Sequence, residues 1–93
     1  MLFSVVCHYK PGAAARTAET AAAFTSHLEQ PLMGIRLAGP LRNAKGEQTG
    51  FLALLEAQSF AEADDFLKSS PNLEAGLYER VEIEQLEPEI GRL

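Results

Sequence analysis

Residues 27–41 read HLEQPLMGIRLAGPL, and this stretch organises the rest of the chain. A helix that carries His27 is expected to end here, because Pro31 cannot continue a helix. A strand follows and leaves through Gly39-Pro40, which we expect to bend or bulge it. Histidine is the side chain whose ordinary pKa lies nearest neutrality. If the protein performs chemistry, we expect the site to include this stretch.

Four segments have the composition of strands. Residues 2–9 (LFSVVCHY) and 51–57 (FLALLEA) are largely apolar on both faces, which predicts central strands of a sheet. Residues 33–42 form a second strand, and residues 43–50 read as the turn of a hairpin. Residues 77–87 (LYERVEIEQLE) alternate between apolar and charged side chains, which is typical of a strand with one exposed face.

The alanine-rich residues 13–29 predict one helix that begins after Pro11-Gly12. His27 lies at the edge of its apolar stripe, near the helix C-terminus, where the helix dipole favours the protonated imidazole. The stripe that we expect to be buried contains Ala14, Ala18, Ala21, Phe24, Thr25 and Leu28.

A second helix is predicted from Ser59, which with Glu62 fits a capping box, to about Ser69. Ser70-Pro71 then opens a short helical turn, with Ser70 as its N-cap. The residues of the second helix expected to face the core are Phe60, Ala63, Phe66 and Leu67.

The resulting order, β-α-β-β-α-β, is the ferredoxin-like plan of an α+β domain, here a single domain of residues 1–93. Both helices would cover one face of an antiparallel sheet. The other face would expose an apolar patch too large for a monomer, so we predict a homodimer that packs sheet against sheet.

The net charge of −5 argues against nucleic-acid binding, and no apolar run reaches the ~20 residues of a membrane span. Residues 1–46 carry five basic and two acidic side chains, whereas residues 47–93 carry three basic and eleven acidic ones. The acidic half reads as a solvated face; alternatively, Arg36, Arg42 and Lys45 form an anion-attracting mouth. With one cysteine and no recognisable secretory leader, we expect a cytoplasmic protein.

Common catalytic motifs are absent from the sequence, which has no phosphate loop, CxxC, HExxH or GxSxG. Two histidines on different elements are a weak case for a metal site, and we expect neither a metal nor another cofactor. His27 reads either as a catalytic group or as a helix-end residue beside the dipole. Arg36 is a solvated strand residue or an anion contact, and Tyr78 belongs to the core or to a pocket wall.

Short motifs in a fixed order give the chain a family resemblance. They are LFSVVCHY at residues 2–9, His27-Leu28, Ala38-Gly39-Pro40-Leu41, the proline turn at Pro71 and Ala75-Gly76-Leu77-Tyr78. On these motifs the chain resembles the YciI-like (YCII-related) domain family. The resemblance implies a dimeric α+β barrel, similar in architecture to muconolactone isomerases and small cofactor-independent oxygenases.

The resemblance also implies an active site that pairs the helix histidine, here His27, with the aspartate of an Asp-Pro-aromatic motif. Some relatives are implicated in removing halide from intermediates of aromatic-ring degradation. This chain has Ser70-Pro71-Asn72 at the motif. Ser70 can serve as an N-cap as aspartate does, but it supplies no carboxylate to His27. The carboxylates that could stand in for it are Asp64, Asp65 and Glu74.

Three hypotheses follow. In the first, the protein is a lyase or isomerase in which His27 and Ser70 act on a small aromatic or lactone-like compound. In the second, it is a dimeric ligand-binding or accessory module that has lost the histidine–aspartate pair. In the third, it is an interaction domain that uses its acidic face. The residues expected to line a small-molecule pocket are Arg36, Gly39, Pro40, Asn72 and Tyr78.

Overall fold

The computed structural model describes residues 1–29 and 34–91. The predicted roles of Pro31 and Met33 therefore lie outside the described residues. The element order confirms the predicted β-α-β-β-α-β plan. The elements are β1 (Leu2–Tyr9), the 3₁₀ helix η1 (Ala13–Glu19), α1 (Ala21–Leu28), β2 (Gly34–Arg42), β3 (Gln48–Glu56), α2 (Phe60–Lys68), α3 (Pro71–Glu74) and β4 (Tyr78–Leu86).

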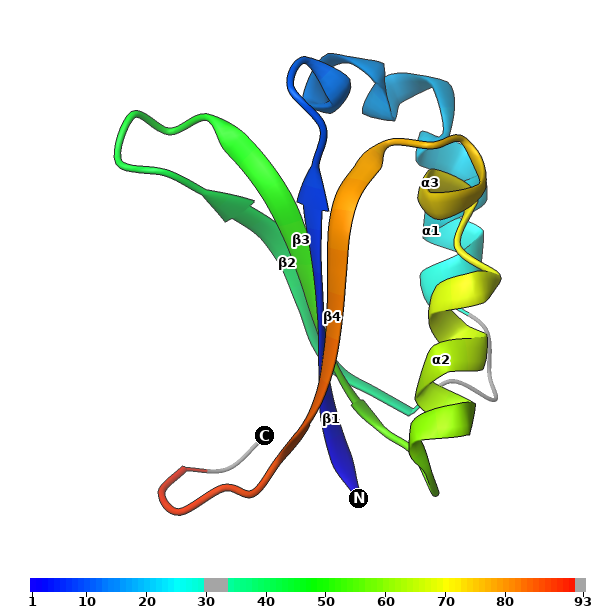
Figure 1. The fold of residues 1–93 in the computed structure, drawn as a ribbon, viewed down its shortest axis with the longest axis vertical. Coiled ribbons are helices and arrows are strands. Elements are labelled where there is room, and N and C mark those ends of the chain that lie inside the picture. Colours follow the sequence, from blue (N-terminus) through cyan, green and yellow to red (C-terminus); the bar gives the residue numbers. More distant parts are fainter. Residues whose placement is uncertain (30–33, 92–93) are drawn as a thin grey trace.

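The four strands form one sheet in the order β2-β3-β1-β4, and all three neighbouring pairs are antiparallel. β1 and β3 are thus the central strands, as their apolar composition predicts. The helices α1, α2 and α3 lie together on one side of the sheet (Figure 1), and the view from behind shows the same layer. The fold is therefore the predicted ferredoxin-like α+β arrangement.

The core lies between the sheet and the helix layer. The register of the central pair places alternate residues on this side, with Phe3 opposite Leu55 and Cys7 opposite Phe51. These side chains are buried, because α2 and the following turn close over them. The other core residues are Val5, Tyr9, Ala13, Ala53, Ala57, Ala63, Phe66, Leu67, Leu77 and Tyr78.

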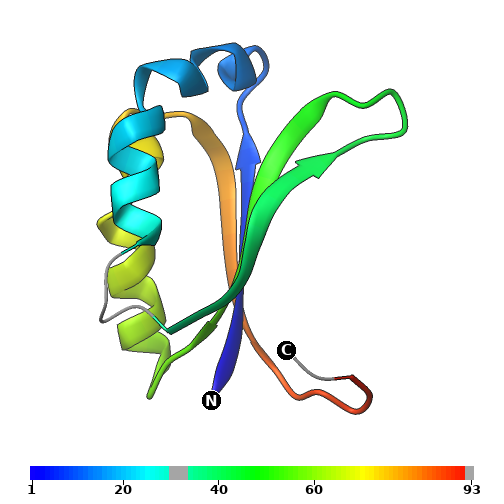
Figure 2. The same cartoon turned by 180° about the vertical axis from the view of Figure 1, so that it is seen from behind.

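The opposite face of the sheet carries no helix and combines apolar side chains on β1, β2 and β3 with charged ones on β4. Leu54 of β3 is half-buried there, and its neighbour Leu37 on β2 is 52% exposed. The segment after β4 turns toward this side (Figure 2), and with the sheet it borders a groove of about 660 Å³. The groove is lined by Leu2, Arg36, Leu54, Glu56, Leu86 and residues 87–91.

The first helical segment differs from the single helix predicted for residues 13–29. It divides at Thr20 into the 3₁₀ helix η1 and the α-helix α1. The Thr17 hydroxyl donates to the carbonyl of Ala14 at 2.9 Å, and the Thr20 hydroxyl donates to the carbonyl of Thr17 at 3.2 Å. Such local bonds compete with a regular α-helix and account for the break.

The break also changes which residues are buried. Because a 3₁₀ helix has three residues per turn rather than 3.6, the apolar stripe does not continue in phase from η1 into α1. Ala18, Ala21 and Thr25, which we predicted to be buried, are exposed. The fully buried side chain of α1 is His27, which we placed at the edge of the stripe.

The start of α2 is as predicted, since the Ser59 hydroxyl accepts a hydrogen bond from the Glu62 amide at 3.2 Å. The prediction that Phe60 faces the core is wrong, because its side chain is 53% exposed. Only one edge of Phe60 contacts the core, where it meets the ring of Phe3 at 4.8 Å between centroids.

The β2–β3 hairpin is tighter than predicted. The Asn43 side chain accepts hydrogen bonds from the amides of Lys45 and Glu47, so β3 begins at Gln48 rather than Phe51. The predicted bulge at Gly39-Pro40 is also wrong, because both residues stay in register with β3. The register of β2 shifts instead between Ile35 and Leu37 and between Leu41 and Arg42. β2 is an edge strand, where a proline without an N–H can remain in register.

Candidate functional site

His27 is buried at the C-terminal end of α1, with only 3% of its surface exposed. Its ring stacks on Phe66 of α2, with 4.6 Å between centroids and 25° between planes. Burial lowers the pKa of His27 from its ordinary value of 6.5, because the charged imidazolium loses its hydration. The neutral ring therefore dominates at pH 7, although the helix dipole favours the protonated form.

The hydrogen bonds around His27 favour the tautomer that carries its proton on Nδ1. The Ser69 hydroxyl lies 3.5 Å from His27 Nδ1 and donates its hydrogen to the Phe66 carbonyl at 3.0 Å. Since a hydroxyl has one hydrogen, the oxygen of Ser69 accepts from Nδ1–H. The lone pair of the neutral ring is then on Nε2, which has no hydrogen-bond partner among the described residues.

Ser70 follows α2 and precedes α3, and its side chain is 3% exposed. We expected this hydroxyl to cap α3, but it makes no capping bond; the Ser70 carbonyl instead accepts from the Glu74 amide at 3.1 Å. A helix of four residues with proline at its first position has few free amides for a cap to satisfy. The Ser70 hydroxyl makes no well-formed hydrogen bond within the described part of the chain, although the Tyr78 phenol lies beside it.

His27 and Ser70 line the same small cavity between the sheet and the helices. Its volume is about 10 Å³, which leaves room for little more than one oxygen atom. Apolar side chains make up most of its wall. The remaining lining residues are Val5, Cys7, Phe24, Phe51, Ala53, Phe66, Leu67 and Tyr78.

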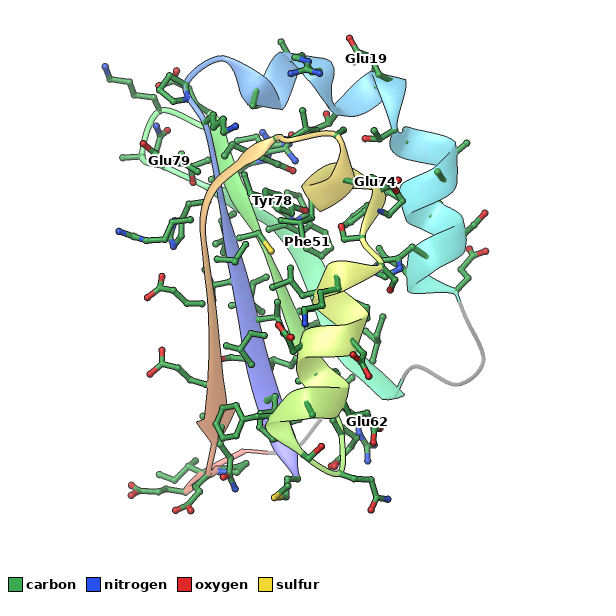
Figure 3. The ribbon with its side chains drawn as sticks, turned by 45° about the vertical axis from the view of Figure 1, so that its right-hand side comes forward. Glu19, Phe51, Glu62, Glu74, Tyr78 and Glu79 are labelled. Atoms are coloured by element: carbon green, nitrogen blue, oxygen red, sulfur yellow. The ribbon has the colours of Figure 1, made fainter. Side chains whose placement is uncertain are left out.

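Cys7 and Tyr78 are the other polar residues of the cavity wall. Burial raises the pKa of the Cys7 thiol to about 11 and raises the pKa of the Tyr78 phenol still further from its ordinary value. The polar side chains of Asn72 and Ser70 beside the phenol oppose its shift only in part. Both groups are neutral at pH 7, so His27 is the base of this cavity. Figure 3 shows Tyr78 and Phe51 between the sheet and the helix layer.

A larger concavity of about 330 Å³ lies beside the small cavity. Phe24 and Phe51 line both spaces, and their rings meet edge to face at 4.9 Å between centroids. Polar groups at its rim include Gln48, which reaches the Tyr9 hydroxyl at 3.5 Å, and Asn72. The Thr20 hydroxyl bonds the Asn72 side chain and so joins the break in the first helix to α3.

The predicted pocket residues fall into two groups. Pro40 and Asn72 line the 330 Å³ concavity, and Tyr78 lines the cavity with His27. The structure does not bring Gly39 and Arg36 to His27. Gly39 pairs with Leu52 on the helix-free side of the sheet, and Arg36 forms a 3.5 Å ion pair with Glu56 beside the groove.

A carboxylate partner for His27 is missing from the described residues. Of the three stand-ins, Asp64 pairs with Lys68 at 2.8 Å, while Asp65 and Glu74 are exposed on the outer helix surfaces. Figure 3 shows Glu74 on α3, at the outer layer of the molecule. Residues 1–29 and 34–91 also hold no group of three His, Cys, Asp or Glu side chains placed to bind a metal ion, and no helix there is long and apolar enough to cross a membrane.

Sequence reasoning missed most of the apolar wall of the site and the residue that orients the histidine. Phe24, Phe51 and Phe66 read only as core residues, and Ser69 only as the end of a helix. The spacing of Phe24 and His27 on one helical face was the available signal. Cys7 belongs to the cavity wall because the register of the sheet places it opposite Phe51, and the sequence alone does not give this register.

Comparison with known proteins identifies the family. The sequence model of the YCII-related domain matches residues 1–87. The chain belongs to this family. No curated protein matches the chain in sequence.

This YCII-related protein is also similar to solved structures of other proteins. It is similar to 5-chloro-2-hydroxyhydroquinone dehydrochlorinase (TftG) of Burkholderia phenoliruptrix, in complex with 2,5-dihydroxybenzoquinone, at 27% identity over 94% of each chain and a TM-score of 0.84. Rv0793 of Mycobacterium tuberculosis (20% identity, TM-score 0.56, 98% of this chain and 100% of that one) shares the fold. PA3566 of Pseudomonas aeruginosa also shares the fold, at 20% identity and a TM-score of 0.53 over 94% of this chain and 91% of that one.

The lowered pKa of His27 predicts how stability depends on pH. In the unfolded chain the imidazole takes up a proton near pH 6.5, whereas in the folded protein it resists protonation to a lower pH. Acid therefore favours the unfolded state, and the loss begins near pH 6.5 and continues down to the folded-state pKa. Urea unfolding between pH 7.5 and 5 should show the wild type losing more stability than His27→Gln, which does not titrate. Equal losses in both proteins would contradict a lowered pKa.

Proposed function

We propose that this protein is a small-molecule enzyme in which neutral His27 accepts a proton from a small ring compound, in lyase or isomerase chemistry. One observation carries the proposal: two buried polar atoms, His27 Nε2 and Ser70 Oγ, have no partner among the described residues and belong to residues that line one cavity. Leaving a buried polar group unpaired costs about 1–3 kcal/mol. Such a cost is typical of a site that keeps its groups free for a ligand.

The electrostatics of the site suit a general base. A histidine whose pKa lies below 6.5 is unprotonated at pH 7, and its free lone pair is on Nε2. Elimination of HCl, the reaction in the name of the similar Burkholderia enzyme, requires such a base. The base takes a proton from the substrate, the electrons of that bond form the new double bond, and chloride leaves with the electrons of the carbon–chlorine bond.

The 330 Å³ concavity supports a ring-sized substrate. It lies directly beside the cavity of His27, and its walls combine the rings of Tyr9, Phe24 and Phe51 with the amides of Gln48 and Asn72. Apolar walls with a few polar groups are typical of small-molecule sites. Release of chloride from 5-chloro-2-hydroxyhydroquinone, and isomerisation of small unsaturated lactones, are the reactions to assay first.

A second candidate is a binding module without turnover. The absence of a carboxylate near His27 in the described residues favours it, because such a pair would raise the basicity of the imidazole. Calorimetry with 2,5-dihydroxybenzoquinone separates the two candidates when run beside the turnover assays. Binding without any turnover favours the module, and turnover that depends on His27 favours the enzyme.

The assembly that we propose is a homodimer through the helix-free face of the sheet. Half-buried Leu54 and exposed Leu37 lie side by side there, next to the 660 Å³ groove. A second copy would cover this apolar surface. We also propose that the protein is cytoplasmic. Its single cysteine, Cys7, is buried with a pKa raised to about 11, which agrees with the reducing conditions of that compartment.

Replacing Leu54 with glutamate is expected to convert the dimer into a monomer, because the new carboxylate would be buried against the partner sheet. Sedimentation or light scattering at micromolar concentration measures the change. Ala22→Glu, on the exposed surface of α1, is the control and should remain dimeric. A wild-type protein that is monomeric under these conditions would contradict the proposed assembly.

A further inference from the structure

The cavity of His27 and Ser70 has a defined hydrogen-bonding character. In the tautomer that the Ser69 contact favours, with the proton on Nδ1, His27 Nε2 offers a lone pair and no hydrogen. Ser70 Oγ can donate one hydrogen and accept others. An occupant with a single hydrogen that satisfies both atoms donates this hydrogen to Nε2 and accepts from Ser70.

The size of the cavity limits that occupant to one atom. Its volume of about 10 Å³ admits a single oxygen, and most of its wall is apolar, including Val5, Phe51 and Phe66. A hydroxyl oxygen donates and accepts at once, whereas a carbonyl or ether oxygen has no hydrogen to give to Nε2. A bound water meets the same requirement, and among the functional groups of a ligand a hydroxyl meets it with one atom.

We propose that this cavity is the subsite for one ionisable hydroxyl of the substrate, which donates its hydrogen to His27 Nε2 while its oxygen accepts a hydrogen bond from Ser70 Oγ. The inference rests on the proposed function and narrows its substrate to small rings that carry a phenolic or enolic hydroxyl. It gives Ser70 a role that neither a capping residue nor a core residue would have.

Proton transfer in this arrangement leaves a stabilised anion. The O–H bond breaks, its proton forms the N–H bond of an imidazolium at Nε2, and the electron pair stays on the oxygen. The Ser70 hydroxyl donates to this oxyanion, and the imidazolium beside it is an opposite charge in a site that excludes water. A carboxylate at position 70 would repel the same anion, so serine suits a hydroxylate better than aspartate would.

The ring that carries the hydroxyl has one adjoining space. The 330 Å³ concavity shares Phe24 and Phe51 with the cavity. Phe51 is fixed in the central strand β3 and buried, whereas Phe24 of α1 is only partly buried. Rotation of the Phe24 side chain is therefore the motion that would join the two spaces and bring a bound ring to His27.

The test uses 4-nitrophenol, whose phenolate absorbs at a longer wavelength than the phenol, and its methyl ether 4-nitroanisole. The wild type is expected to bind 4-nitrophenol with an increase in phenolate absorbance, and to bind 4-nitroanisole at least 10-fold more weakly. Equal affinity for the two compounds, or no binding of 4-nitrophenol, would overturn the inference.

Ser70→Ala should weaken binding of the phenolate by roughly 10- to 100-fold, since a hydrogen bond to a charged oxygen is lost. It should also raise the apparent pKa of bound 4-nitrophenol by about one unit, a change that a purely structural role would not produce. Ser26→Ala, on the exposed surface of α1, is the matched control, and melting curves verify that each variant is folded.

The two proposals fail in different ways. An unchanged affinity and pKa in Ser70→Ala would overturn the hydroxyl subsite even if the protein turns over a substrate. Conversely, the expected behaviour of 4-nitrophenol in a protein without turnover would support the subsite while the proposed enzyme activity fails.

Discussion

Replacement of His27 with alanine is expected to lower kcat/KM for the proton-transfer reaction by roughly 10²- to 10⁴-fold, the usual contribution of a positioned general base. His27 is the one group lining the closed cavity that is both unprotonated and basic at pH 7, because burial keeps Cys7 and Tyr78 as neutral acids. Chloride release from 5-chloro-2-hydroxyhydroquinone, or isomerisation of a small unsaturated lactone, provides the assay.

His27→Gln guards against a loss that comes only from a hole in the core, since glutamine has similar bulk and polarity without basicity. Both variants should lose activity together. His8→Ala is the matched control, because the second histidine pairs with Glu82 on the other face of the sheet. Full turnover by His27→Gln would remove His27 from the mechanism.

Gly50→Ala is expected to destabilise the protein by about 3 kcal/mol, at the upper end of the range for overpacking. A Cβ at Gly50 would lie 2.2 Å from the carbonyl oxygen of Cys7 and 3.3 Å from its carbonyl carbon. Both atoms belong to the backbone of the central strand β1, which is hydrogen-bonded on both sides and cannot move away. Urea unfolding monitored by circular dichroism measures the loss.

Gly39→Ala is the matched control for that substitution. Gly39 also lies in a strand, but a Cβ there would have no atom within 4 Å beyond its chain neighbours, so its effect should remain within about 0.5 kcal/mol. A loss below about 1 kcal/mol for Gly50→Ala would show that β1 and β3 can separate locally, against the packing described above.

The strands were predictable because their signals are local. Apolar residues on both faces of residues 2–9 and 51–57 require central positions, and the β2-β3-β1-β4 order follows from the ferredoxin-like plan. The division of the first helix at Thr20 was not predictable from alanine content. It depends on hydroxyl-to-carbonyl bonds of Thr17 and Thr20, which helix propensity does not include.

The site was predictable in part. His27 and Ser70 stood out as residues, but their shared cavity brings together side chains from β1, β3, β4, α1, α2 and the residue before α3. The spacing of residues within a single helix or strand does not predict that these side chains line one cavity. The sequence also did not predict the lowered pKa of His27, because that shift comes from burial, and the burial depends on packing against Phe66 and the core.

Serine at position 70, where the family resemblance implies an aspartate, is consistent with a neutral His27. A carboxylate beside the imidazole would favour the imidazolium and so a proton donor. With serine there, the histidine remains neutral, as the proposed proton acceptor requires, and the hydroxyl could stabilise the proposed anion.

Nitrogen-15 NMR of the histidine rings tests the central claim most directly, because the chain contains only His8 and His27. At pH 7 the free protein should show His27 neutral, with Nδ1 protonated and Nε2 bare. Saturation with 4-nitrophenol should then protonate Nε2 and leave His8 unchanged. A His27 that carries its proton on Nε2 in the free protein, or that does not respond to bound phenol, would contradict the account.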